Sequence, residues 1–78
     1  MSISTLDAAA VDVSTTDRRL QVLLRDGRII SVPLSWFPRL EAASDESLSG
    51  WRLIGDGAGI HWAELDEDLS VVSLLRVA

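Results

Sequence analysis

The stretch RLQVLLRDGRIISVPL, residues 19–34, decides the fold because two alternating apolar runs flank a strong turn signal. The alternating residues are Leu20, Val22 and Leu24 in the first run and Ile30, Val32 and Leu34 in the second. A period of two places each set on one face of an extended chain, so we predict strands over residues 19–25 and 28–34. Asp26-Gly27 between the two runs predicts an antiparallel hairpin.

The matching of apolar faces sets the length of the hairpin loop. A two-residue turn pairs Val22 with Ser31, whereas a three-residue loop over residues 25–27 pairs Val22 with Ile30. Only the second register keeps the apolar residues together, and a slip of one residue would turn the buried set outward. We therefore expect a type I turn in which Gly27 is left-handed and forms a bulge.

Strand patterns also occur on both sides of this hairpin. Val11 and Val13 alternate with polar residues and predict a strand over residues 9–14, while residues 1–8 show no strong period and are expected to fray. A second hairpin is predicted by residues 51–54 and 59–62, which flank a turn over residues 55–58.

Serine residues mark the starts of short helices, because a serine hydroxyl accepts a hydrogen bond from an amide group in the first turn. The expected caps are Ser35 for residues 36–42, Ser44 for residues 45–48, and Ser70 for a last helix containing Val71, Val72, Leu74 and Leu75. Pro38 falls in the first turn of the first helix, where its missing N–H does little harm.

These elements indicate one small α+β domain over residues 1–78, with a small antiparallel sheet and two or three short helices. A chain of this length cannot supply two self-sufficient cores. The expected core contains Leu20, Val22, Ile30, Val32, Phe37, Leu40, Trp51 and Ile60.

Composition places the chain among globular proteins and excludes several classes. Hydrophobic residues make up 47% of the chain, and no apolar run approaches the roughly 20 residues that cross a bilayer. The chain has no cysteine, so neither a disulfide nor a thiolate metal site is available. The N-terminal segment lacks the pattern of a secretory signal, and we expect a cytoplasmic protein.

The charge of the chain is unevenly distributed. The net charge is −5; residues 1–40 carry five Arg against four Asp, and residues 41–78 carry two Arg against eight acids. An acidic protein repels the phosphate backbone, so direct nucleic-acid binding is disfavoured. A nucleic-acid regulator would have to use the arginines around the first hairpin, which are Arg18, Arg19, Arg25 and Arg28.

No pattern in the sequence supports catalysis, and we expect no enzymatic activity and no cofactor. His61 is the only histidine, whereas a catalytic zinc usually has three protein ligands. A structural or surface role for His61 is therefore the simpler interpretation. The densest carboxylate cluster is Glu64, Asp66, Glu67 and Asp68. It is interpreted as a solvated loop or, if functional, as an anionic surface for an arginine-rich partner.

The glycine-rich segment and the tryptophans each allow a structural and a functional interpretation. Gly55, Gly57 and Gly59 favour a hairpin turn over a phosphate cradle, because a strand-like segment follows them and the chain has no lysine. Trp36, Trp51 and Trp62 are expected to pack in the core. Since tryptophan is enriched at interaction hot spots, one of the three is a candidate partner contact.

Three segments carry a family resemblance: WFPRL at residues 36–40, Trp51-Arg52, and GIHWAELDEDLSV at residues 59–71. Together they closely resemble the bacterial domain of unknown function family 2442, over about residues 10–76. The resemblance implies a small α+β fold and no established enzymatic activity. It also implies a partner, a second small protein encoded beside the gene, as in toxin and antitoxin pairs. Leu48, Ala63 and Val72 depart from the family's usual residues.

The leading hypothesis is a protein-binding module that resembles the antitoxin or regulatory member of a two-gene pair. The candidate partner-binding residues are Trp36, Arg52, His61, Trp62, Glu64, Asp66, Asp68 and Val72. The alternative is a metal- or small-ligand-binding domain that uses the segment from His61 to Asp68. A homodimer is also expected, because Val72 widens the apolar surface of the last helix on a flank shared with Arg76.

Overall fold

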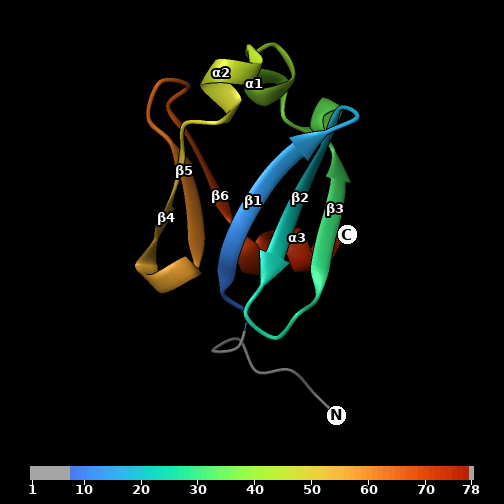
Figure 1. Ribbon diagram of the computed structural model, residues 1–78, viewed down its shortest axis with the longest axis vertical. Helices are drawn as coiled ribbons and strands as arrows, with labels where there is room; N and C mark the ends of the chain where they lie inside the picture. The colour runs from blue at the N-terminus through green and yellow to red at the C-terminus, as the bar shows by residue number, and fades with distance from the viewer. Residues whose placement is uncertain (1–7, 78) are drawn as a thin grey trace.

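The computed structural model describes residues 8–77 and contains two antiparallel sheets of three strands each, accompanied by short helices (Figure 1). Sheet 1 comprises β1 (Ala10–Thr16), β2 (Arg19–Leu24) and β3 (Ile29–Pro33), and sheet 2 comprises β4 (Trp51–Ile54), β5 (Gly59–Trp62) and β6 (Glu67–Ser70). The helical segments are η1 (Leu34–Trp36), α1 (Pro38–Glu41), α2 (Asp45–Leu48), η2 (Gly55–Gly57) and α3 (Val71–Val77). The predicted α+β class is confirmed, with two sheets where one was expected.

The central hairpin has the predicted register. Val22 lies opposite Ile30 and Leu20 opposite Val32. The amide of Gly27 donates to the carbonyl of Leu24 at 3.0 Å, and Gly27 has a φ of 94°, as expected for a three-residue loop closed by a left-handed glycine.

Strand β1 forms, but its alternation is broken by a bulge. Ala10 lies opposite Leu24, whereas Asp12 lies opposite Leu23, so one extra residue is inserted at Val11. Val11 is consequently 46% exposed, while Ala10 and Val13 are buried. Ala8, at the end of the predicted frayed tail, is also buried, and residues 1–7 of that tail lie outside the described residues.

The first predicted helix is split, and Ser35 is not its cap. Pro38 begins α1, and the residue before it, Phe37, has an extended backbone with φ of −128° and ψ of 91°. A residue before proline is disfavoured from the helical region, so the turn over η1 cannot continue into α1. The Ser44 cap is confirmed, since its hydroxyl oxygen accepts a hydrogen bond from the amide of Ser47 at 3.1 Å.

Sheet 2 contains the predicted second hairpin and one strand that was not predicted. Residues Glu67–Ser70 were expected to include the end of a polar loop, but they form the edge strand β6 beside β5. The polar side chains of an edge strand are compatible with pairing because one face remains in water. Ser70 then caps α3, with its hydroxyl oxygen 3.3 Å from the amide of Ser73.

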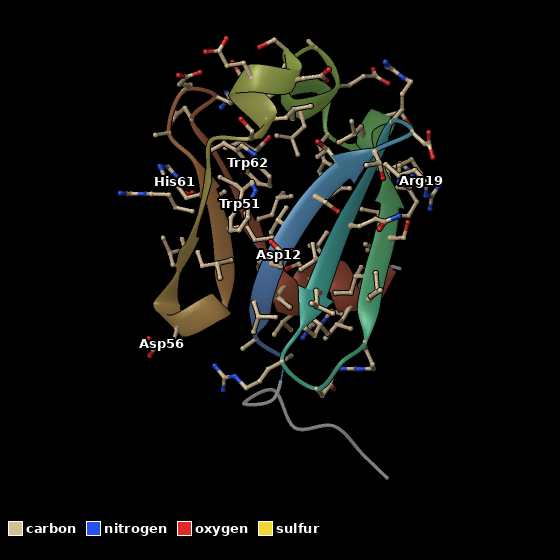
Figure 2. All side chains as sticks on the ribbon, viewed as in Figure 1. Asp12, Arg19, Trp51, Asp56, His61 and Trp62 are labelled. Carbon is tan, nitrogen blue, oxygen red and sulfur yellow. The ribbon has the colours of Figure 1, made fainter. Side chains whose placement is uncertain are left out.

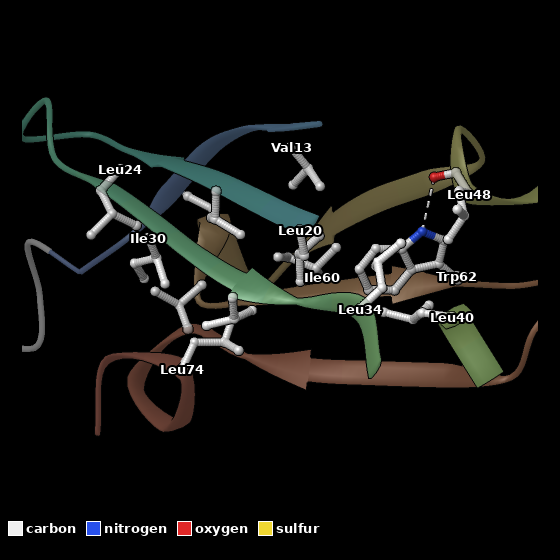
Figure 3. Close-up of a cluster of buried hydrophobic side chains, with 14 of the residues drawn as sticks. Val13, Leu20, Leu24, Ile30, Leu34, Leu40, Leu48, Ile60, Trp62 and Leu74 are labelled. Carbon is white, nitrogen blue, oxygen red and sulfur yellow. Dashed lines mark hydrogen bonds between the residues drawn. The ribbon is translucent and has the colours of Figure 1, made fainter. Parts of the chain in front are cut away.

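One core joins the two sheets to the helices (Figure 3). Of the predicted core residues, Leu20, Val22, Ile30, Val32, Leu40 and Ile60 are buried, and Phe37 and Trp51 are partly buried against them. The largest fully buried side chain is Trp62, which projects from β5. Val71 and Leu74 place one side of α3 in the same core. Within residues 8–77, no helix has the length and apolar character needed to span a membrane.

Candidate functional site

The short helices α1 and α2 lie together at one end of the molecule (Figure 1), and several of the predicted partner-binding residues belong to this end. We call this surface the helical end and define it by η1, α1, α2 and the turn over residues 63–66. Arg39 links α1 to this turn, because its Nη1 donates to the carbonyl of Asp66 at 2.7 Å. Ser47 links α2 to it, with its hydroxyl 2.9 Å from a carboxylate oxygen of Glu64. The predicted site residues Glu64 and Asp66 are therefore held on one surface.

The three tryptophans have three different environments. Trp36, in η1, is 50% exposed, whereas Trp62 is 0% exposed. The indole N–H of Trp62 donates to the carbonyl of Leu48 at 3.0 Å, so this side chain is fully used inside the core. The prediction that Trp62 contacts a partner is therefore wrong, because no part of it reaches the surface. Trp51 is partly buried, and Trp36 is the tryptophan that a partner can reach.

Carboxylates dominate the charge of the helical end. The exposed acids there are Glu41, Asp45, Glu46, Glu64 and Asp66. Arg18, from the adjoining β1–β2 turn, approaches Glu41 at 3.7 Å, but both side chains are well exposed and the pair contributes little. A depression of about 580 Å³ opens beside this pair, with Leu34 and Leu48 among its apolar lining and Asp17 and Asp45 among its acidic lining.

A second group of predicted residues lies on sheet 2, and Figure 2 shows one of them, His61, on the face that points away from sheet 1. Arg52, His61 and Asp68 are cross-strand partners on β4, β5 and β6, and we call them the charged row. The Nδ1 atom of His61 pairs with a carboxylate oxygen of Asp68. Asp68 and Arg52 are exposed, and His61 is partly buried. The charged row and the helical end are separate surfaces.

The four groups required by the metal-binding alternative do not converge. Asp68 pairs with His61, Glu64 binds Ser47, and Asp66 lies in the turn beyond them. Among residues 8–77, no three His, Asp or Glu side chains are grouped so that they could hold a metal ion. The geometry therefore provides two ligands at most for one ion at this place.

The glycine-rich segment is the turn of a hairpin, as predicted. Gly55–Gly57 forms η2 and leads into β5, not into a helix whose N-terminus could bind phosphate. Gly57 is buried with a φ of 93°, and a Cβ atom there would lie 2.5 Å from the carbonyl oxygen of Ala10. This glycine permits the close approach of η2 to β1.

The arginines around the first hairpin have partners within the chain. Arg19 donates to the Ser31 hydroxyl at 2.9 Å, and Arg28 pairs with Asp26 at the same distance. Arg25 donates to the carbonyl of Asp56 at 3.4 Å. Each of these three guanidinium groups therefore has a contact within the chain, and all of these contacts lie at the surface.

Helix α3 presents the flank that was expected to contact a second copy or a partner. Val71 and Leu74 are buried, whereas Val72 is partly buried and Arg76 is exposed. The Val72 side of the helix is therefore less covered than its core side, as its spacing predicted.

Sequence reasoning missed the shallow depression next to the charged row. It has a volume of about 390 Å³ and is lined by Ile54, Gly55, Ala58, Gly59, Asp68, Leu69 and Ser70. Three of these residues lie on β6, so the depression could not be foreseen while that segment was read as a loop and a helix cap. The alternation of Asp68, Leu69 and Ser70 was the available signal.

Two three-stranded antiparallel sheets around one core, with short helices at one end and a terminal helix, define the molecule as a small α+β domain. The chain belongs to the family described as Protein of unknown function (DUF2442), whose model matches residues 10–78.

Two solved structures share the fold. The first is the crystal structure of a protein of unknown function from Rhodospirillum rubrum, 32% identical, with a TM-score of 0.78 over 88% of this chain and 86% of that one. The second is the solution NMR structure of an uncharacterized protein from Chromobacterium violaceum, 20% identical, with a TM-score of 0.75 over 87% of this chain and 64% of that one. Among proteins with curated descriptions, no significant match was found.

Proposed function

We propose that this chain is a small protein-binding module whose helical end binds a basic protein partner. The observation that carries the proposal is the half-exposed indole of Trp36. This residue lies in η1 at the helical end, on a surface that is otherwise rich in carboxylates. Tryptophan is the residue type most enriched among interface hot spots, because it buries a large area with little loss of side-chain freedom. Half of this ring is left in water in the free domain.

Charge supports a basic partner. The five exposed acids of the helical end are opposed there by Arg18 and Arg39, and Arg39 is already bonded to the carbonyl of Asp66. Charges at the rim of an interface steer encounter and exclude partners of the same sign. A partner rich in arginine gains from both effects, and an acidic one is repelled.

The partner that the family resemblance favours is the product of the neighbouring gene, which this chain would neutralise in the manner of an antitoxin. Neutralisation requires only that a surface be occupied, so it needs no catalytic group in this chain. The protein-binding role is the broader proposal, and the antitoxin-like role is its more specific form.

The test is the affinity of the purified chain for the protein encoded by the neighbouring gene. We expect binding that weakens with salt, and a loss of roughly 30-fold in affinity for Trp36→Ala, the effect of a hot spot of about 2 kcal/mol. Ile29→Ala is the matched control, because Ile29 is 63% exposed at the far end of β3. It should bind like the unaltered chain.

The proposal has two parts, the binding surface at the helical end and the antitoxin-like role, and each part can be contradicted separately. Absence of binding to the neighbouring protein, or equal losses for Trp36→Ala and Ile29→Ala, rejects the helical end as the binding surface. If binding occurs as expected, but expression of the neighbour alone has no effect on growth that this chain reverses, the antitoxin-like role is rejected and the binding module remains.

A further inference from the structure

The outer face of sheet 2 consists of two short rows of side chains. The first is the charged row; the second, one register step further along the strands, contains Ile54, Gly59 and Ser70, and we call it the small row. Successive residues of a strand point to opposite faces, so residues two apart on β4, β5 and β6 share this face. Arg52, Ile54, Asp68 and Ser70 are all exposed.

The charged row has opposite charges at its two ends. Arg52 lies on the edge strand β4 and Asp68 on the edge strand β6, about 10 Å apart at the usual spacing of two strands. His61 lies between them and is paired with Asp68. Among residues 8–77, the Arg52 guanidinium has neither an ion pair nor a hydrogen bond. The row therefore exposes a cation that its own sheet does not neutralise.

The small row has an apolar projection at one end and a hollow at the other. Ile54 is 41% exposed, and its side chain lies over Gly59, where an added Cβ would be 3.0 Å from its Cγ1 atom. The shallow depression of about 390 Å³ begins beside Ile54 and Gly59 and extends to Leu69 and Ser70 on β6. The residues that leave this hollow are a glycine and a serine.

We infer that this face binds the same face of a second copy of the chain. The two copies are related by a two-fold axis that is parallel to β5 and lies midway between their facing copies of sheet 2. Rotation about this axis places β4 of one copy over β6 of the other. The Arg52 of each copy then lies over the Asp68 of the other, and each Ile54 lies over the other copy's Ser70 and its hollow. One axis thus satisfies both rows, as a self-complementary interface requires. The two His61 rings meet at the axis.

The small size of the face indicates a weak association. Each sheet contributes three strands of four residues, and aligned sheets pack about 10 Å apart. Such an area falls below the roughly 1,200 Å² at which specific interfaces become standard in size, so the dimer is weak and exchanges with monomer. This self-association is independent of the partner proposed for the helical end, because it uses a different surface.

Charge reversal and mixing give the decisive experiment, read by sedimentation equilibrium over a series of protein concentrations. Arg52→Asp places like charges at both contacts of the homodimer, and Asp68→Arg does the same with the opposite sign. Each variant alone should raise the dimer dissociation constant by at least about tenfold. An equimolar mixture of the two should recover association, because both contacts of the mixed dimer again join an arginine to an aspartate.

Three further variants complete the design. Ile54→Glu leaves the charged row intact and should also prevent association, which gives a second disruption if Asp68→Arg fails to fold by circular dichroism. Trp36→Ala should leave self-association unchanged, so that failure here and failure of the partner at the helical end are separate results. Val72→Glu tests the flank of α3 as the competing surface and should have no effect.

The inference is overturned by any of three results. A chain that stays monomeric at every concentration has no such interface. Folded single reversals that associate like the unaltered chain, or that remain monomeric when mixed, show that Arg52 and Asp68 do not meet. Loss of the dimer in Val72→Glu but not in Ile54→Glu assigns the contact to α3.

Discussion

The indole nitrogen of Trp62 donates a hydrogen bond of 3.0 Å to the carbonyl oxygen of Leu48 (Figure 3). Leu48 is the last residue of α2, where helix carbonyl groups have no partner within the helix. A side chain from β5 supplies that partner inside the core. The bond therefore joins the helical end to the middle strand of sheet 2 and fixes the position of α2.

Trp62→Phe should lower the free energy of unfolding by about 2 to 4 kcal/mol, because it leaves a buried carbonyl unpaired and opens a small cavity. Urea denaturation followed by circular dichroism measures the change. Trp36→Phe is the control, since half of that ring is in water, and it should change stability by less than about 0.5 kcal/mol. Similar losses for the two variants would show that the hydrogen bond to Leu48 has no stabilising role.

Val22→Asp should leave the domain unfolded at room temperature. Val22 lies in the middle of the central strand of sheet 1 and is fully buried, so the carboxylate would lose its hydration without gaining a partner. Leu23→Asp, on the adjacent residue of the same strand, points to the outer face and should remain folded. Thermal melting of both variants is the measurement, and an unchanged melt for Val22→Asp would contradict the assignment of the strand faces.

Gly57→Ala should be much more destabilising than Gly27→Ala, although both glycines have almost the same φ. At Gly27 the new methyl group meets open space, so only the left-handed backbone is penalised, by about 1 to 2 kcal/mol. At Gly57 the methyl group also collides with the backbone of Ala10. Chemical denaturation of the two variants separates the backbone penalty from the effect of the collision. Equal losses of stability would mean that η2 moves away from β1 without cost.

Arg18→Gly should raise stability slightly. Asp17 and Arg18 form the β1–β2 turn with φ values of 51° and 59°, and a left-handed arginine is unfavourable by about 1 to 2 kcal/mol. Glycine removes that strain but has more freedom in the unfolded chain, so the net gain is about 0.5 kcal/mol. The exposed pair with Glu41 is a small loss. A decrease of more than about 1 kcal/mol would assign that pair a larger role than exposed pairs have.

The sequence was informative wherever a periodic pattern and a turn signal agreed. The hairpin from Arg19 to Pro33 was predicted to the register, because only one loop length keeps Val22 opposite Ile30. Prediction from the sequence failed where an element depends on a contact between residues that are distant in the chain. The bulge at Val11 depends on pairing with β2, and the strand β6 depends on β5 beside it.

The candidate site was foreseen as a set of residues, not as two surfaces. His61 and Asp68 are seven residues apart in the sequence and become direct partners only when β5 and β6 pair. Trp62 was expected either to pack in the core or to meet a partner, and no local pattern distinguishes these outcomes. Its burial in the core also depends on a partner for the indole N–H, and the carbonyl of Leu48 supplies that partner from another element.

The close approach of Gly57 to Ala10 has a consequence for how the two sheets are held together. It brings η2, the turn of the sheet 2 hairpin, against β1 of sheet 1 at one end of the molecule, whereas the hydrogen bond between Trp62 and Leu48 joins sheet 2 to α2 at the opposite end (Figure 1). The turn of one sheet's hairpin thus rests directly on the first strand of the other sheet, so a side chain at position 57 would change the spacing between the two sheets as well as the hairpin itself.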